Sequence, residues 1–256
     1  MKLHAVVISW EGTEERARLI ATHVREHIDR VSLTYSTSGS DLVIPGVPAA
    51  RVPPEWYFGR KFAHAIGTWG DEAMLLIQAD AEATSWREVV AGCVRALSTP
   101  PIKMWSPEID VTPWPTDVVR LPFSSPSHYR VVAHTDGIVL GLGADVVQRL
   151  KQLDYRHNNL GWGIDWVALC YTYAHNGVAV RDQSVNVRHA PGSGYRLEEA
   201  ARLMQEFLTQ MTLTEQVQYE FLRSAIQSRR DHLRTQNAPG RQVVGGQRQM
   251  APGSVP

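Results

Sequence analysis

The sequence predicts an α/β fold with a mixed, mostly parallel sheet, helices on both faces, and a single domain plus C-terminal helices. Short apolar runs bounded by polar residues, such as Met74–Ile77, are typical of buried strands in a sheet that is covered on both faces. These runs alternate with segments of helical period, and such alternation favours parallel strand order. With 256 residues, the chain can bury a full core.

Predicted strands and helices alternate through the first half of the chain. The strands span 3–9, 31–36 and 72–79, and the helices span 11–28, 56–70 and 85–97. The first helix has acids in its first turn, and Ala17, Ile20 and Val24 lie on one of its faces. Ser85 or Thr84 caps the third helix. A polar, proline-rich connection follows the second strand and ends near residue 54.

The second half of the chain is less regular. Residues 100–129 contain many prolines and little periodicity, which predicts one or two edge strands and a long loop. The following elements are strands within 130–142, helices over 144–153 and 165–177, short strands over 178–180 and 184–189, and two C-terminal helices. Thr212 and Glu215 form a capping box for the last helix. Residues 235–256 have the composition of a disordered tail.

Composition excludes several classes of function. Lysine plus arginine total 26 and aspartate plus glutamate total 26, so net charge gives no argument for nucleic acid or an anionic membrane as a partner. Cys93 and Cys170 lie in apolar segments, which indicates reduced protein from a cytoplasm. The first apolar run is too short for a signal peptide, and no window is long enough to cross a bilayer. We expect a soluble cytoplasmic protein; its oligomeric state is left open.

Polar residues follow three of the predicted strands. Ser9-Trp10-Glu11 follow the first, Tyr35-Ser36-Thr37 the second, and Asp80 and Glu82 the third. Ligands of parallel sheets bind beyond the carboxyl ends of the strands. Two acids one residue apart suit Mg²⁺ or Mn²⁺, which take few protein ligands and complete their shell with water and substrate phosphates. A nucleoside diphosphate is therefore the expected substrate, although two acids here could also be merely solvated near a helix N-terminus.

This order of elements, ending in Asp80-Ala81-Glu82, resembles the GT-A-fold, nucleotide-sugar-dependent glycosyltransferases over roughly residues 3–200. The resemblance implies that Asp80 and Glu82 hold a divalent cation, Mn²⁺ or Mg²⁺, with Glu82 replacing a commoner aspartate. His189 matches a late histidine that many members use as a third metal ligand, and a surface histidine is the alternative. The implied donor nucleotide site comprises Ser9, Trp10, Glu11, Tyr35, Ser36, Lys61, Ala79, Asp80, Tyr195 and Arg196. Lys61 and Arg196 could equally be solvated residues.

The segment NLGWGIDWVALC matches the family again, just before a predicted buried helix. In inverting members an acid at this place deprotonates the acceptor hydroxyl, and Asp165 is the matching residue. Trp162 and Gly163 are the expected acceptor-binding residues. Asp165 could instead be only a helix cap. Because it stands at a helix N-terminus, we expect its pKa to be low.

The resemblance divides the chain into an expected nucleotide-sugar-binding half over 1–105, an acceptor-binding and catalytic half over 106–196, C-terminal helices over 197–234, and the tail. The predicted function is that of a metal-dependent inverting glycosyltransferase. It would move a hexosyl or related sugar from a nucleoside-diphosphate donor to a hydroxyl acceptor, in glycan or polysaccharide biosynthesis. The alternative is a catalytically idle relative that binds a nucleotide or glycan or acts as a scaffold, for which the Glu82 substitution leaves room.

Overall fold

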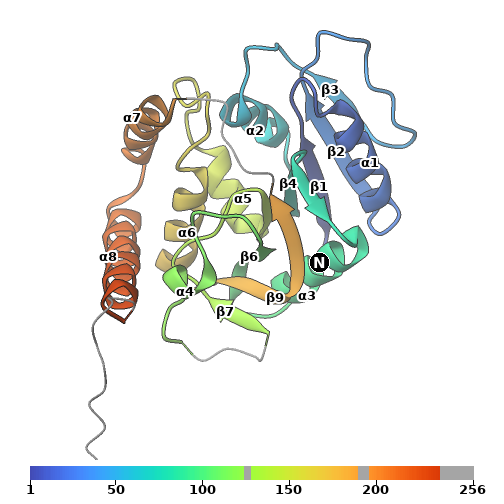
Figure 1. Cartoon of the computed structure of the whole chain (residues 1–256). Helices are drawn as coiled ribbons and strands as arrows, with labels where there is room; N and C mark the ends of the chain where they lie inside the picture. Colours follow the sequence, from blue (N-terminus) through green and yellow to red (C-terminus); the bar gives the residue numbers. More distant parts are fainter. Residues whose placement is uncertain (124–127, 190–195, 237–256) are drawn as a thin grey trace, which may run out of the picture.

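The described strands form one sheet in the order β3-β2-β1-β4-β8-β6-β9-β5, with β7 pairing beside β9. Figure 1 shows β2, β1 and β4 side by side in this sheet. The computed structural model describes residues 1–123, 128–189 and 196–236. The strands are β1 (Leu3–Ile8), β2 (Arg30–Tyr35), β3 (Ala49–Arg51), β4 (Ala73–Gln78), β5 (Ala81–Ala83), β6 (Ile102–Ile109), β7 (Tyr129–Val131), β8 (Val139–Leu142) and β9 (Val178–His189). The helices are α1 (Glu14–Arg25), α2 (Phe58–Gly67), α3 (Trp86–Leu97), α4 (Thr116–Val119), α5 (Ala144–Lys151), α6 (Ile164–Ala174), α7 (Leu197–Leu208) and α8 (Leu213–Gln236).

The N-terminal half of the sheet is parallel. β1 pairs with β2 and β4, and β2 pairs with β3, all in parallel register. Helices α1 and α3 pack on one face, while α2, α5 and α6 pack on the other. The prediction of a mixed, mostly parallel sheet with helices on both faces is therefore confirmed. Parallel order places the carboxyl ends of β1, β2 and β4 at one edge of the sheet.

The second half of the sheet is mixed. β8 runs antiparallel to β4 and β6, and β9 runs parallel to β6 but antiparallel to β5 and β7. β6 lies between β8 and β9, so the prediction that residues 100–129 hold only edge strands was wrong. Proline normally indicates an edge strand, but Pro107 stands at a register shift between β6 and β9, where an interior strand tolerates proline.

Strand β9 is continuous, although the sequence predicted two short strands. Its pairing with β6 jumps from Asp182 to Asn186, and this irregularity separates the two predicted segments. β3 and β5 were not predicted at all, since three residues are too few to show a period. Glu82 lies inside β5 and not in a loop.

The local signals for helix ends are confirmed at two positions. Ser85 caps α3, because its hydroxyl accepts a hydrogen bond from the Glu88 amide at 3.3 Å. The Thr212 hydroxyl accepts from the Glu215 amide at 3.3 Å, and the Glu215 carboxylate accepts from the Thr212 amide at 2.7 Å. This is the predicted capping box. The last helix runs to Gln236, so the prediction that the tail begins at residue 235 was wrong by two residues. The rest of the predicted tail lies outside the described residues.

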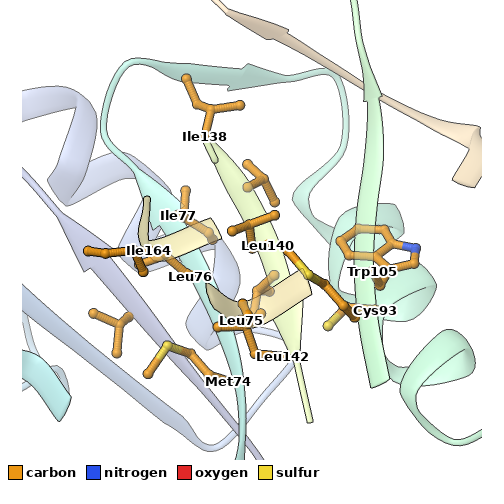
Figure 2. Close-up of a cluster of buried hydrophobic side chains, with 14 of the residues drawn as sticks. Met74, Leu75, Leu76, Ile77, Cys93, Trp105, Ile138, Leu140, Leu142 and Ile164 are labelled. Carbon is orange, nitrogen blue, oxygen red and sulfur yellow. The ribbon is translucent and has the colours of Figure 1, made fainter. Parts of the chain in front are cut away.

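The core fixes β4 in place. Met74, Leu75, Leu76 and Ile77 are fully buried, and Figure 2 shows them among Leu140 and Leu142 of β8 and the side chains of Cys93 and Trp105. Full burial of each such side chain contributes roughly 1.5–3 kcal/mol relative to exposure. The polar residues that come after β4 are therefore attached to a strand whose side chains are fully packed in the core. None of the helices in the described ranges has the length and apolar character needed to span a membrane.

Candidate functional site

Asp80 and His189 lie side by side where β4 and β9 end. Asp80 stands two residues beyond β4, and His189 is the last residue of β9. Antiparallel pairing of β5 with β9 places Ala81 opposite His189. The Oδ2 atom of Asp80 lies 3.6 Å from Nε2 of His189, and both side chains are 25% exposed. The structure thus brings together two of the three residues predicted to hold a metal.

A carboxylate that the sequence did not reveal lies on the other side of the same imidazole. Oδ2 of Asp136 is 3.6 Å from Nδ1 of His189. β8 runs antiparallel to β4 and pairs Val139 with Ile77, so the segment just before β8 lies at the carboxyl end of β4. An acid before an apolar run is a weak signal, and only the direction of β8 makes it part of this site.

The charges of these three side chains depend on one another. Hydrogen bonds to Asp136 and to Asp80 raise the pKa of His189 to about 9, and burial opposes them only in part. Burial acts to raise the pKa of Asp136, but hydrogen bonds from His189 and Thr112 outweigh it and the net shift is downward. In the absence of a cation, His189 is therefore an imidazolium between two carboxylates.

The side chain of Glu82 contacts α1 and not His189. Its carboxylate lies 3.5 Å from the guanidinium of Arg16 on α1, and the Glu82 side chain is half exposed. Its strand partner is Arg188. Of the acid-x-acid pair, only Asp80 has a recorded contact with His189.

The donor atoms at Asp80 and His189 suit a hard divalent cation. Oδ1 of Asp80 is buried and has no hydrogen-bond partner in the described structure, which is costly for a carboxylate unless something positive satisfies it. No group of three or more His, Cys, Asp or Glu in the described ranges has the spacing of a complete metal site. Mg²⁺ and Mn²⁺ need few protein ligands when substrate phosphates and water supply the others, so Asp80 and His189 fit such an ion.

Asp165 lies in the first turn of α6, beside His134. Its Oδ1 accepts a hydrogen bond from the Trp166 amide at 2.9 Å, and its Oδ2 lies 3.3 Å from Nε2 of His134. Burial raises the pKa of Asp165 to about 6, against the hydrogen bond from the Trp166 amide. The expectation of a low pKa was therefore wrong, because desolvation exceeds the effect of the helix N-terminus.

His134 was not predicted as a site residue. It is almost fully buried, with its ring stacked on Trp114 at 4.1 Å and edge-on to Trp166 at 4.3 Å. Burial lowers the pKa of His134 to about 3, so the ring is neutral at physiological pH. Neither ring nitrogen has an aligned hydrogen-bond partner in the described structure. The imidazole beside Asp165 is therefore uncharged and makes no aligned hydrogen bond with it in the described structure.

Three predicted donor-site residues meet at the ends of β1 and β2. The Lys61 ammonium donates to the Ser9 carbonyl at 2.7 Å and to the Ser36 hydroxyl at 2.7 Å. Lys61 is fully buried, which contradicts its interpretation as a solvated helix residue. Burial lowers its pKa to about 8, although the nearby Glu14 opposes this shift. The buried ammonium of Lys61 thus lies at the carboxyl ends of β1 and β2.

The other predicted donor residues fall into two groups. Tyr35 and Ala79 are buried: Tyr35 donates to Asp41 at 3.4 Å, and the Ala79 amide bonds the Ile8 carbonyl at 2.9 Å. Trp10 is partly buried, with its ring 6.0 Å from the Lys61 ammonium, and Glu11 is exposed and accepts from Ser38.

The predicted acceptor residues lie at the N-terminus of α6, and Arg196, the last residue of the loop (193–196) that the resemblance implies over the donor, lies at the N-terminus of α7. Trp162 packs against Leu160, Ala200 and Leu203. Gly163 has φ +93°, and an added Cβ there would come within 3.1 Å of Met204, so both its backbone and its surroundings favour glycine. Arg196 is exposed and precedes α7. Ser193, Gly194 and Tyr195 lie outside the described residues.

Comparisons with known proteins bear on the fold. No family model matches the chain, and no curated protein sequence matches it. In structure it is similar to GalNAc-T7 solved with UDP, GalNAc and Mn²⁺, with a TM-score of 0.57 and 12% identity over 80% of this chain and 48% of that one. The chain thus spans about half the length of that protein.

This chain matches a larger share of two further solved structures. The mannosyltransferase PcManGT from Pyrobaculum calidifontis, in complex with GDP-Man and Mn²⁺, matches with a TM-score of 0.55 and 12% identity over 93% of this chain and 76% of that one. Glucosyl-3-phosphoglycerate synthase from Mycobacterium tuberculosis, in complex with Mn²⁺, UDP-glucose and phosphoglyceric acid, matches with a TM-score of 0.52 and 15% identity over 86% and 80%. Together with the strand order, these similarities show that the chain has the GT-A fold of nucleotide-sugar glycosyltransferases, as a single α/β domain.

Proposed function

We propose that the protein is a metal-dependent inverting glycosyltransferase that moves a sugar from a nucleoside-diphosphate donor to a hydroxyl acceptor. The observation that carries this proposal is the contact of Asp80 with His189 at the end of β4, with one oxygen of Asp80 buried and unpaired. The solved structures of similar fold contain Mn²⁺ with a nucleotide or nucleotide sugar, which supports the same type of ligand here.

The donor diphosphate is proposed to bind at the ends of β1, β2 and β4. Asp80 and His189 would hold Mn²⁺ or Mg²⁺, which as a Lewis acid stabilises the negative charge of a departing diphosphate. Lys61 holds the Ser9 carbonyl and the Ser36 hydroxyl in fixed positions, so these strand ends are preorganised for the nucleotide. Glu82 contacts Arg16 instead, and its part in metal binding would require the side chain to turn. Tyr195 and Arg196 are proposed to contact the donor from the following loop.

Asp165 is proposed to be the base that takes the proton of the acceptor hydroxyl. Its pKa of about 6 leaves most of it ionised at neutral pH and makes it a stronger base than an ordinary aspartate. Transfer with one base and without a covalent intermediate inverts the anomeric carbon. The acceptor is proposed to bind near the Trp162-Gly163 turn at the N-terminus of α6. The division into a nucleotide-sugar half over 1–105 and an acceptor half over 106–196 is part of the same proposal.

The finer identity of substrate and pathway is part of the same proposal. A hexosyl or related donor, a glycan acceptor and a role in polysaccharide biosynthesis follow from the resemblance in sequence. A cytoplasmic location is supported by Cys93 and Cys170, which are both buried and both free thiols.

A catalytically idle relative that binds a nucleotide or glycan, or acts as a scaffold, is the alternative. The specific observation in its favour is that Glu82 forms an ion pair with Arg16 and does not face His189. In such a relative Asp165 would not act as a base, and nucleotide binding would not require a metal.

Calorimetry and activity assays separate the two. A panel of nucleoside diphosphates is titrated with and without Mn²⁺, and sugar transfer or donor hydrolysis is then measured for the nucleotides that bind. The proposal predicts Mn²⁺-dependent binding and turnover in the wild type. Asp80→Ala with Glu82→Ala should abolish both, because no carboxylate of the pair then remains. Binding that is unchanged by Mn²⁺, without turnover of any donor, would support the idle relative.

A further inference from the structure

His189 has a carboxylate on each side of its ring, and only one of them belongs to the predicted metal pair. Nε2 faces Asp80 and Nδ1 faces Asp136, each at 3.6 Å. We infer that Asp136 is a positioning residue, which holds His189 through Nδ1 so that Nε2 is presented to the cation beside Asp80. This inference rests on the proposed function, since it requires that a cation binds at Asp80 and His189.

The chemistry of imidazole determines which nitrogen of His189 carries a proton when the other binds a cation. A histidine that binds a cation through Nε2 must release the proton from that nitrogen and keeps a single proton on Nδ1. That proton needs an acceptor, and a carboxylate in this position fixes the ring orientation and raises the basicity of the ligating nitrogen. In the described structure, Asp136 is the carboxylate recorded in contact with Nδ1.

Asp136 is held in place independently of His189. Its Oδ1 accepts a hydrogen bond from the Ile138 amide at 3.3 Å, and the Thr112 hydroxyl bonds the same carboxylate. The residue is only 9% exposed. A carboxylate that is already oriented by its own loop loses little entropy when it orients the imidazole, which is the requirement for a supporting residue.

Glu82 does not supply this support, because its carboxylate pairs with Arg16. With the Glu82 carboxylate 3.5 Å from Arg16, it has no recorded contact with either nitrogen of the imidazole. The support for His189 therefore comes from the segment before β8 and not from the acid-x-acid pair.

Asp136→Asn tests the inference with little change in volume. The amide oxygen can still accept from Ile138, so the turn is kept, and the amide nitrogen then faces Nδ1. A donor at that place favours the tautomer with its proton on Nε2, the nitrogen needed for the metal. We expect Mn²⁺ affinity, measured by electron paramagnetic resonance with UDP or GDP present, to fall by about 10- to 100-fold. Asp136→Glu, which restores a carboxylate, should recover part of the loss.

Asp145→Asn is the matched control. It removes the same charge from an aspartate whose partner is Lys103 at 2.7 Å, away from His189, so Mn²⁺ affinity should stay at the wild-type value. Equal affinity of the wild type and Asp136→Asn would overturn this inference and leave the proposed function standing. If the wild type binds no Mn²⁺ with any nucleoside diphosphate present, the proposed function fails and this inference fails with it.

A second measurement does not depend on any variant being folded. Long-range ¹H–¹⁵N spectra of the wild type, with diamagnetic Zn²⁺ in place of Mn²⁺, report which imidazole nitrogen carries the remaining proton. We expect the proton of His189 on Nδ1. A proton on Nε2 in the metal-bound protein would overturn the inference.

Discussion

Nε2 of His134 lies 3.3 Å from Oδ2 of Asp165, and the histidine side chain is only 2% exposed. The ring is held between Trp114 and Trp166 and is neutral, because burial lowers its pKa to about 3. A neutral neighbour does not cancel the charge of the Asp165 carboxylate. It also leaves the desolvation of that carboxylate uncompensated, which agrees with the raised pKa of Asp165.

Asp165→Asn should remove the proposed base and leave the donor site intact. Because a positioned base typically contributes about 100- to 10,000-fold, we expect kcat to fall by a factor in this range. The dissociation constant for the nucleotide with Mn²⁺ should change much less than kcat, since the change keeps the size of the side chain and Asp165 is not one of the proposed metal ligands. Steady-state kinetics and calorimetry measure the two quantities. Full activity of Asp165→Asn would exclude the residue as the base.

The pH dependence of transfer should carry the signature of Asp165. A base acts in its ionised form, so kcat/KM should rise with pH and level off above a pKa of about 6. An aspartate with an unperturbed pKa would place this rise about two pH units lower. Rates are measured with saturating Mn²⁺ at every pH. The residual activity of Asp165→Asn serves as the control and should not show the same rise; an unchanged rise would assign it to another group.

Lys61→Met should destabilise the fold at the ends of β1 and β2. The change leaves the Ser9 carbonyl and the Ser36 hydroxyl without their buried donor, and an unsatisfied buried polar group costs about 1–3 kcal/mol. We expect the free energy of unfolding in urea to fall by this amount. Lys151→Met is the control, because Lys151 is exposed and donates to the Trp69 carbonyl at 2.8 Å, so its loss should matter less. Equal stability of Lys61→Met and the wild type would contradict this view.

His4 should make the protein less stable in mild acid. Its ring is stacked on Trp69 and bonded to the Ser32 hydroxyl, and burial, with a smaller effect of Arg30, lowers its pKa from 6.5 to about 4. Between these values the unfolded chain binds a proton that the folded chain does not, so stability is lost as pH falls from about 6.5 to about 4. The shift corresponds to roughly 3 kcal/mol at its full extent.

The measurement compares urea unfolding of the wild type and His4→Gln at several pH values. The variant should lose less stability than the wild type over this interval, because its side chain does not titrate. His23→Gln, which changes an exposed histidine on α1, is the control and should follow the wild type. Parallel curves for the wild type and His4→Gln would show that His4 does not carry the effect.

Much of the first half of the fold could be predicted because its signals are local. The apolar run in β4, the amphipathic period of α1 and the cap at Ser85 depend on neighbours within one or two turns. The capping box at Thr212, near the C-terminus, is local in the same way. Errors arose where pairing depends on distant residues. β6 contains a proline and still lies inside the sheet, since β8 and β9 cover it on both sides. β3 and β5 exist only because β2 and β9 provide a partner strand.

Some residues of the candidate site could likewise be predicted from local signals, and others could not. Asp80, Asp165 and His189 are marked in the sequence, because each stands where an apolar strand or helix ends or begins. Asp136 carries only the weak signal of an acid before an apolar run, and neither His134 nor the ion pair of Glu82 with Arg16 is marked at all. Their environment is created by the antiparallel insertion of β8 beside β4 and by the aromatic rings of Trp114 and Trp166.

The sequence by itself determined the alternation of strands and helices and the polar residues that end them, since hydrophobic period and capping act over a few residues. Tertiary structure alone decided that Asp136 faces His189, that Lys61 is buried between two strand ends, and that the pKa of Asp165 is raised. These properties depend on desolvation and on contacts between segments far apart in the chain, and no local pattern of residues encodes them.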